Sequence, residues 1–376
     1  MTGGEARLAE LFVDRQAVAR NVQHFRRITG TSVMAVVKAD AFGHGDVAQI
    51  ALDHGATWIG VASIPEALVL RADGIAAPIL SWLNPVHAAW EDAIAASIDV
   101  AVTSIEQLYA IAAAAERCGT PARVHLHLDV GMSRDGAPSE IWSVLCVAAR
   151  ELEKADRVDV VGIMGHLSNA DDPDHAQNDT ERLRFTNGVR AARRRGLTPR
   201  ELHLAASAAA LHRPDMRFSL SRVGAGLYGI DPSARAELAP ALTLTVPVAQ
   251  LREVHAHQGV GYGHDHVTGE ATTLAVLPIG YGDGLPRAAQ GRAEVSIRGQ
   301  RLPIVGRISM DQVVVDVGQH PVELGDVALV LGPGGRGEPT ARDWAAWAGT
   351  IEHEIVTRIG IRRSRVLRTA DERLSR

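Results

Sequence analysis

The sequence predicts a (β/α)8 barrel followed by a smaller, mostly antiparallel β-domain. Eight short apolar runs alternate with helix-like stretches from near residue 33 to near residue 230. Each strand of a parallel sheet needs a crossover to return, usually a helix, so this alternation indicates a parallel sheet. With eight strands, a closed barrel is favoured over an open doubly wound sheet. From about Ala239 the pattern changes to alternating β-type runs separated by turn residues, which is typical of antiparallel strands.

The predicted barrel domain covers residues 1–235. The segments between its strands carry apolar residues at helical spacing, as in 105–119 and 141–155. The eight predicted strands lie in runs rich in β-branched and apolar residues: 33–39, 58–63, 78–83, 99–104, 123–129, 158–167, 201–207 and 221–230.

The second domain is expected over residues 236–376. One late helix, at 340–360, is predicted to close it because its apolar residues recur with helical spacing. Its predicted strands lie at 242–251, 271–280, 293–297, 301–308 and 313–318.

Composition excludes several classes of function. The chain has 39 Lys plus Arg against 44 Asp plus Glu, a net charge of −5, so nothing favours a nucleic-acid partner. It contains no run of about 18–20 apolar residues that would span a membrane. The first 15 residues lack the basic and apolar regions of a signal peptide. Cys118 and Cys146 form neither a disulfide framework nor a metal-binding spacing, which favours the cytoplasm and predicts no metal site.

The carboxyl ends of barrel strands are where active-site residues are expected. Lys38 closes the first predicted strand and is followed by a glycine-bearing turn. Desolvation at the base of such a lysine lowers the pKa of its amine, and the free amine is the form that makes a Schiff base. The alternative is a surface lysine whose stem lies along apolar neighbours.

A phosphate site is expected at the last two strands of the barrel. Ser207 ends the seventh predicted strand, and Arg222 with Gly224 opens the eighth. A hydroxyl and exposed backbone N–H groups at a glycine can bind phosphate. Together with Lys38 on the first strand, this cradle describes a pyridoxal phosphate site.

Eight ordered segments of the chain resemble the signature blocks of the bacterial alanine racemases. The stretch at 11–26 is also similar to the opening helix of that family. The blocks are AVVKADAFGHG (35–45), LDVGMSRDG (128–136), GIMGHLSNADDPDH (162–175), HLAASAA (203–209), SRVGAGLYGIDPS (221–233), GVGYG (259–263), PIGYGDG (278–284) and GRISMDQ (306–312). The resemblance implies a pyridoxal-phosphate barrel with a C-terminal β-domain, which interconverts L- and D-alanine as a head-to-tail homodimer.

The resemblance implies two catalytic bases, one on each face of the bound substrate. Lys38 carries the cofactor and serves the D-isomer, whereas Tyr262 reaches over from the partner subunit and serves the L-isomer. A phenol has a reference pKa near 10 and needs help from its surroundings to act as a base at neutral pH. His166 matches the family position that hydrogen-bonds this tyrosine, beside the cofactor.

The remaining cofactor and substrate contacts are also implied by the resemblance. Arg222 matches the arginine that faces the pyridine nitrogen, with His203 orienting it. A guanidinium stays charged, so it keeps that nitrogen unprotonated. Arg134 and the backbone N–H of Met310 match the groups that hold the substrate carboxylate.

Further positions match family residues around the phosphate and the entrance. Ser207 and the backbone at Gly224 and Ala225 match the phosphate contacts. Tyr281 matches a tyrosine that narrows the entrance to the site. Asp311 is expected to be a partner within the same substrate-binding loop.

The sequence departs from the family pattern at several positions. Phe42 stands where a tyrosine hydroxyl usually contacts the phosphate, which predicts looser cofactor binding by about 1.5–3 kcal/mol. His127 stands where many members have a lysine that becomes carbamylated, and a histidine forms no stable carbamate. Ala206 replaces an asparagine, Ser309 replaces a cysteine, and Ile361 lies near a position that can be a tyrosine.

These departures leave alternatives open. One is a racemase of another amino acid, such as serine or a basic amino acid, in a specialised pathway. A decarboxylase of similar architecture is disfavoured because Tyr262 matches the second racemase base. A degenerate paralogue that only binds the cofactor is the third alternative. The family implies a cytoplasmic enzyme that makes D-alanine for cell-wall peptidoglycan, while secondary metabolism and catabolism stay open as destinations.

Overall fold

The chain divides into two units, each with its own β-sheet. The computed structural model describes residues 9–45, 47–359 and 364–368. One unit holds Val18–Ala41 and the chain from position 46 to Leu238, and the other holds the residues up to Ala17, Phe42–Gly45 and the chain from Ala239 on. The division into domains at 235/236 stays a prediction.

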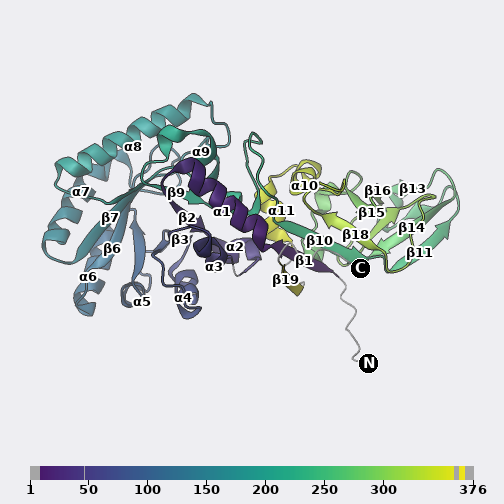
Figure 1. Ribbon diagram of the computed structural model, residues 1–376, viewed down its shortest axis with the longest axis horizontal. Helices are drawn as coiled ribbons and strands as arrows, with labels where there is room; N and C mark the ends of the chain where they lie inside the picture. The colour runs from purple at the N-terminus through teal and green to yellow at the C-terminus, as the bar shows by residue number, and fades with distance from the viewer. Residues whose placement is uncertain (1–8, 46, 360–363, 369–376) are drawn as a thin grey trace. The chain divides into compact units, whose positions relative to one another are not determined.

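The first unit is the predicted barrel, which is confirmed (Figure 1). Its eight parallel strands follow the order β8-β7-β6-β5-β4-β3-β2-β9. Beyond the ladder, Ser219 N donates to Leu202 O at 3.1 Å, which brings β8 and β9 together and nearly closes the barrel. The strands are β2 (Ser32–Val36), β3 (Trp58–Val61), β4 (Ile79–Ser81), β5 (Ile98–Val102), β6 (Ala122–His127), β7 (Val158–Met164), β8 (Glu201–His203) and β9 (Leu220–Val223).

Helices cover the outside of these strands, as Figure 1 shows for α6, α7 and α8 beside β6 and β7. In α6 the Ser104 hydroxyl accepts from Gln107 N at the start, and Gly119 ends the helix with φ 65°. The helices are α1 (Arg15–Thr29), α3 (Ala48–Asp53), α4 (Ile64–Ala72), α5 (Trp90–Ala95), α6 (Ile105–Cys118), α7 (Ser139–Lys154), α8 (Ala176–Arg194) and α9 (Ser207–His212), with the short η1 (Pro214–Met216) and η2 (Ala225–Tyr228).

The barrel interior is filled by side chains, so the barrel is a packed core and not a pore. Large apolar residues from several strands meet there and exclude water from the strand bases. They are Met34, Trp58, Leu80, Ala101, Val161, Met164 and Leu220.

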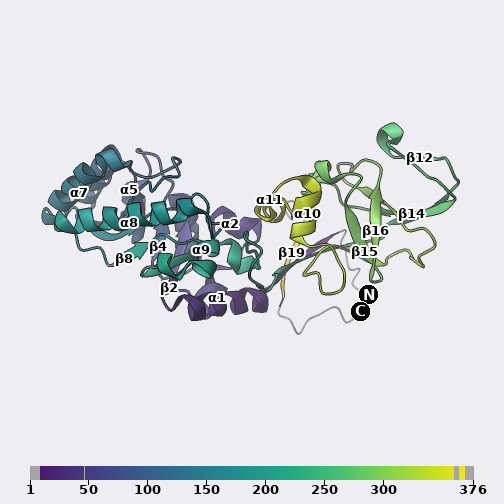
Figure 2. The ribbon, with the colours of Figure 1, turned by 90° about the horizontal axis from the view of Figure 1, so that it is seen from above.

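The second unit contains the predicted antiparallel β-domain, which is also confirmed (Figure 2). Its nine-stranded sheet has the order β11-β14-β17-β16-β15-β18-β10-β1-β19, antiparallel except between β1 and β19. The strands are β1 (Glu10–Asp14), β10 (Leu242–Pro247), β11 (Gln250–Val254), β14 (Thr272–Leu277), β15 (Glu294–Ile297), β16 (Gln300–Val305), β17 (Val313–Asp316), β18 (Val327–Leu331) and β19 (Ser364–Arg368). A separate pair, β12 (Gly259–Val260) and β13 (His266–Val267), forms a small hairpin.

Several local expectations were wrong, and three of them concern a helix start, a divided helix and a missing strand. The opening helix starts only at Arg15, because Glu10–Asp14 pair as β1 and Asp14 Oδ1 then accepts from Gln16 N and Ala17 N as a helix cap. The predicted late helix is two helices, α10 (Ala341–Ala348) and α11 (Glu352–Arg358). Gly349 ends the first of them with φ 68°, a left-handed conformation that glycine adopts easily.

The third error is an omission. Strand β18 lies between β15 and β10 in the sheet and was not predicted. Ile361 and residue 360 fall outside the described residues. Among the described helices, none combines the length and the apolar character needed to cross a bilayer.

Candidate active site

Lys38 lies at the carboxyl end of the first barrel strand, where it begins a strained turn. The strand β2 ends at Val36, so Lys38 does not close the strand as predicted but is the first residue of α2 (Lys38–Gly43). The next four residues, Ala39 to Phe42, have φ between 50° and 63°. A left-handed turn of non-glycine residues costs roughly 1–2 kcal/mol per residue, so neighbouring groups must hold it.

Glu66 is one of the groups that hold this turn, and sequence reasoning missed it. Its Oε1 accepts from Ala39 N at 2.7 Å. Its Oε2 accepts from Ala62 N and Ser63 N at 2.8 and 3.0 Å, which also caps α4. The serine and glutamate at positions 63 and 66 have the spacing of a capping box, the signal that would have located this carboxylate. On the other side of the turn, the Tyr228 hydroxyl donates to Ala41 O at 2.9 Å.

The Lys38 amine is poised to lose its proton more readily than an ordinary lysine. Its pKa is lowered first by burial and then by the positive charges of Arg134 and Arg222, while Glu66 acts in the opposite sense. Lys38 is nevertheless exposed to solvent. Its amine is therefore accessible, although charged side chains lie near it.

Arg222 is the centre of a buried cluster at the barrel mouth. It extends from β9 and is 4% exposed, and burial lowers the pKa of its guanidinium to about 10. Its Nη1 donates to His203 Nδ1 and His203 O at 3.0 and 2.8 Å. Its Nη2 donates to Gly165 O at 2.7 Å and to His166 Nδ1 at 3.1 Å. The guanidinium is therefore held in one orientation.

His166 is neutral and presents an N–H away from the cluster. Its pKa is held well below its usual value by burial and by the charges of Arg222 and Arg134. Because Arg222 only donates, Nδ1 of His166 accepts and the ring proton is on Nε2. The sequence-predicted residues His166, His203 and Arg222 are thus brought together in the structure.

Ser207 and Gly224 also meet, although not where the strands were predicted to end. Strand β8 ends at His203, and Ser207 is the first residue of α9; Arg222 lies within β9, and Gly224 follows that strand. The Ser207 hydroxyl accepts from Gly224 N at 3.1 Å and from Gly226 N at 3.2 Å. A Cβ at Gly224 would meet Val36 at 3.4 Å, which is an ordinary van der Waals contact. Ala225 begins η2 beside it.

Arg134 and His127 differ in surroundings and in charge. Arg134 is exposed in the loop after β6, and no carboxylate among the described residues forms an ion pair with it. His127 is 5% exposed, and its Nδ1 lies 3.7 Å from Asp135 Oδ2. Burial lowers the pKa of His127 to about 4 against the opposing charge of Asp135, so this imidazole is neutral at pH 7.

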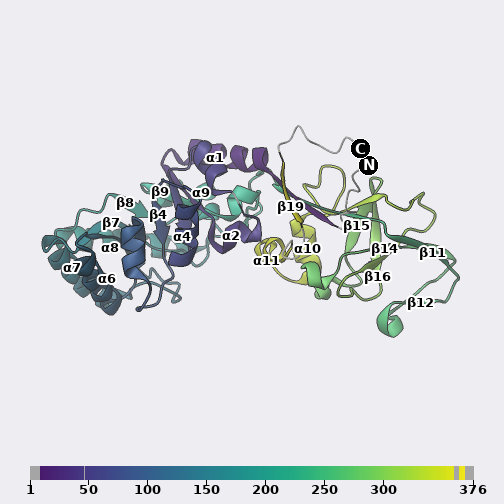
Figure 3. The same ribbon diagram turned by 90° about the horizontal axis from the view of Figure 1, so that it is seen from below.

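Tyr262, Tyr281, Met310 and Asp311 all belong to the second unit. Tyr262 begins the short η3 (Tyr262–His264) in the hairpin of β12 and β13 and is 72% exposed. Figures 2 and 3 show this hairpin at β12, standing away from β15 and β16. An Arg307–Asp265 ion pair of 2.6 Å holds the turn in which Tyr262 lies.

Tyr281 and Met310 are brought together by their backbones. Tyr281 N donates to Ser309 O at 3.0 Å, and Gly282 N donates to Met310 O at 2.8 Å. A Cβ at Gly280 would lie 2.2 Å from Ser309 O, which explains the glycine in this close approach. Asp311 is exposed at the end of the same loop. Phe42, the residue without the expected hydroxyl, packs its ring 6.1 Å from that of His353.

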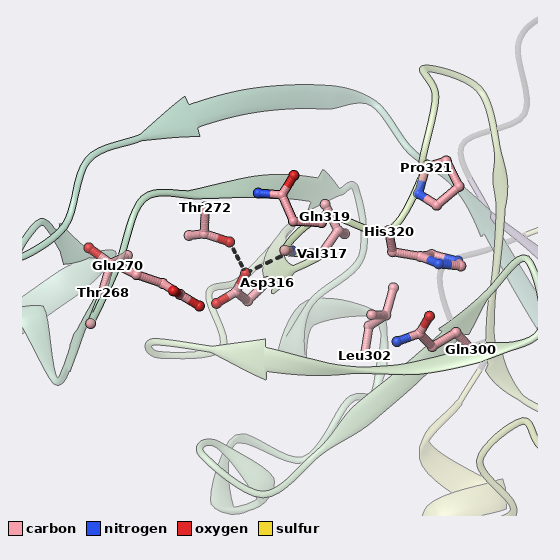
Figure 4. A pocket seen from close by; sticks show the side chains of 12 residues that line it. Thr268, Glu270, Thr272, Gln300, Leu302, Asp316, Val317, Gln319, His320 and Pro321 are labelled. Carbon is pink, nitrogen blue, oxygen red and sulfur yellow. Dashed lines mark hydrogen bonds between the residues drawn. The ribbon is translucent and has the colours of Figure 1, made fainter.

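A cavity of about 550 Å³ in the second unit holds none of the predicted site residues (Figure 4). It lies beside Asp316, whose Oδ1 accepts from Thr272 Oγ1 and Gly318 N. The carboxylate is thus already bonded within the protein.

The fold and the barrel-mouth cluster define the chain as a barrel enzyme with an accessible amine, a buried guanidinium and a hydroxyl–backbone cradle. Two family models match it, the alanine racemase N-terminal domain over residues 13–232 and the alanine racemase C-terminal domain over residues 241–367. The chain therefore belongs to the alanine racemase family, and the resemblance seen in its sequence is confirmed.

Individual relatives agree over nearly the whole chain. An alanine racemase of Salinispora arenicola is 45% identical over 94% of this chain and 96% of its own. One from Mycobacterium tuberculosis is 44% identical over 97% of each chain. The crystal structure of alanine racemase from D-cycloserine-producing Streptomyces lavendulae is 40% identical, with a TM-score of 0.95 over 97% of this chain and 98% of that one. A Bartonella henselae alanine racemase with covalently bound pyridoxal phosphate is 28% identical, with a TM-score of 0.88 over 96% of this chain and 99% of that one.

Proposed function

We propose that this protein interconverts L-alanine and D-alanine with pyridoxal phosphate as its cofactor. The observation that carries the proposal is the barrel-mouth arrangement of Lys38, Arg222 and the Ser207–Gly224 cradle in a chain that matches both alanine racemase family models, over residues 13–232 and 241–367. Isomerisation of an amino acid at its α-carbon needs an electron-withdrawing group and acid/base groups on both faces.

The residues present fit the cofactor chemically. The accessible Lys38 amine, with its lowered pKa, suits an imine link. Ser207, Gly224 and Ala225 supply a hydroxyl and backbone N–H groups for a phosphate, and the Ser207 hydroxyl lies 3.1 Å from Gly224 N. When bound, the cofactor withdraws the electron pair left on the α-carbon after its proton departs.

Arg222 stays cationic next to the cofactor ring in this proposal. Its pKa of about 10 is still well above neutral pH. Its bonds to His203 and His166 leave the guanidinium one orientation. A fixed cation at this position would keep the ring nitrogen of the cofactor unprotonated, which would limit side reactions.

Two bases move the α-proton. Lys38 would take or return it on one face once the substrate amine has displaced the lysine from the cofactor, helped by the lowered pKa of the freed amine. Tyr262 of a second copy of this chain serves the other face. The Nε2–H of His166 is free of Arg222 and supplies a donor for the phenolic oxygen, which stabilises the deprotonated tyrosine.

Arg134 and the Met310 backbone hold the substrate carboxylate. Arg134 has no ion-pair partner among the described residues, so its fork of N–H donors is available for a bidentate contact. Tyr281, whose backbone is joined to the loop of Met310, narrows the entrance, and Asp311 supports that loop.

A homodimer follows from the placement of the second base. Tyr262, Val267 and Met310 are 72%, 52% and 51% exposed in the second unit, and contact with a partner would remove these side chains from water. We place the enzyme in the cytoplasm because Cys118 and Cys146 are both free thiols. Peptidoglycan synthesis is the proposed destination of the D-alanine.

His127 favours a second candidate, a racemase of serine or of a basic amino acid, since this neutral ring stands near the substrate-binding arginine. The test is exchange of the α-proton in deuterated water for L-alanine, L-serine, L-lysine and L-arginine, with the holoenzyme. Alanine should exchange fastest, and Lys38→Ala should abolish exchange. Faster exchange of another amino acid would replace alanine by that substrate, and no exchange at all would leave a cofactor-binding paralogue.

A further inference from the structure

A chain of buried polar side chains runs through the barrel interior from the Arg222 cluster. In barrels of this class the interior is usually filled by branched apolar residues, so a polar chain there needs a reason. It comprises four residues on strands β5, β6, β8 and β9, here called the polar thread: Asp99, His125, His203 and Arg222. They are 1%, 0%, 0% and 4% exposed.

Each hydrogen bond of the polar thread has one possible direction. Arg222 has only donors, so its Nη1 donates to His203 Nδ1 at 3.0 Å. The pKa of His203 is held well below its usual value by burial and by Arg222, so its one proton is on Nε2. That N–H donates to His125 Nδ1 at 2.9 Å.

The far end of the polar thread is an anion. With His125 Nδ1 accepting, its Nε2–H donates to Asp99 Oδ2 at 3.2 Å. Burial alone would raise the pKa of Asp99, but the hydrogen bonds and charges of His125 and Arg123 lower it below its usual value. Arg123 Nε and Nη2 donate to the two oxygens of Asp99 at 2.7 and 3.1 Å. Every donor therefore points toward this carboxylate.

The barrel is built to make room for His125. A Cβ at Gly162 would lie 2.4 Å from His125 Nδ1, closer than real contacts allow. The pairing of β6 with β7 shifts register between Val124 and His125. The ring of Trp58 packs edge-on at 5.4 Å between centroids. These contacts hold the imidazole where it can bridge His203 and Asp99.

We propose that Asp99 and His125 are positioning residues, which hold His203 in its Nε2–H tautomer so that its Nδ1 accepts from Arg222. Ionised Asp99 can only accept and Arg222 at the other end can only donate, so the two ends fix the same direction for all the bonds between them. In the alternative tautomer, the Nδ1–H of His203 would face the Nη1–H of Arg222. Two donors cannot form a hydrogen bond, so the guanidinium would rotate out of this position. The expected effect on catalysis rests on the proposed function, whereas the expected tautomers do not depend on it.

The first test measures the tautomers in the wild-type holoenzyme. Nitrogen-15 spectra of the histidine rings, assigned with His125→Gln and His203→Gln, should show both rings neutral with the proton on Nε2 at pH 7. A neutral Nδ1–H form or a cation at either ring would overturn the proposal. The tautomers can be measured even if the protein racemises no amino acid. An error in the proposed function can therefore be distinguished from an error in the proposed role of the polar thread.

The second test removes the anion. Asp99→Asn keeps the size of the side chain, and Asp159→Asn is the matched control, since Asp159 also lies near Arg123 at 3.7 Å but outside the polar thread. Outer partners of functional groups typically change activity by about 10–100-fold, so kcat should fall by that factor with little change in KM. The His203 nitrogen shifts and the absorption spectrum of the bound cofactor should change as well. Wild-type kcat and shifts in Asp99→Asn would refute the proposal, and if this variant does not fold, the wild-type tautomers decide.

Discussion

Replacing Glu66 by Gln should destabilise the turn that follows Lys38. The glutamate accepts three backbone N–H bonds, of which the shortest, from Ala39, is 2.7 Å. A glutamine has a single acceptor oxygen, so it can serve either the turn or the start of α4 but not both. Loss of a hydrogen bond to a charged group costs about 1.5–3 kcal/mol.

The free energy of unfolding should therefore fall by about 1.5–3 kcal/mol in urea titrations of Glu66→Gln. Cofactor should also bind at least about tenfold more weakly, because 1.4 kcal/mol corresponds to a factor of ten and the turn carries Lys38. The matched control is Glu116→Gln, since Glu116 pairs with Arg157 at the surface, where such pairs contribute at most about 1 kcal/mol. Equal stability and equal cofactor affinity in Glu66→Gln and wild type would refute the role given to this carboxylate.

Three further substitutions follow from the structure. Phe42→Tyr should tighten pyridoxal phosphate about tenfold or more in titrations of the apoenzyme, by restoring one hydrogen bond to a charged group; an unchanged affinity would contradict this. His127 has a pKa of about 4 when folded, below the ordinary value, so the unfolded chain binds the extra proton first. The contribution of the neutral imidazole to the free energy of unfolding should be complete above about pH 6.5 and should fall by about 3 kcal/mol as the pH drops to about 4. His127→Gln should remove this part of the pH dependence of urea unfolding. Gly162→Ala should lower the free energy of unfolding by about 1–3 kcal/mol because its Cβ would meet His125, whereas Gly269→Ala, with open space around it, should leave it unchanged.

Local patterns predicted most of the elements because they depend on neighbours in the chain. The alternation of apolar runs and helical spacing placed the start of each barrel strand within one residue of its observed position, whereas the last strand ends at Val223 and not at 230. The errors lie where a single residue, or a partner far away in the chain, determines the local secondary structure. Gly349 splits the late helix with its positive φ, and Glu10–Asp14 become a strand only because β10 and β19 lie beside them.

The sequence by itself determined the fold class, the family and the identity of the residues that cluster around Arg222, because strand periodicity and ordered motifs are written in the linear chain. Only the tertiary structure revealed that Glu66 holds the turn after Lys38. The same is true of Asp99 and His125, which look like ordinary polar positions in strand segments. Their partners are separated by 27 residues for Glu66 and Ala39, 26 for Asp99 and His125, and 78 for His125 and His203. Hydrogen-bond direction depends on which groups the closed barrel brings within about 3 Å of each other, and spacing along the chain carries no such information.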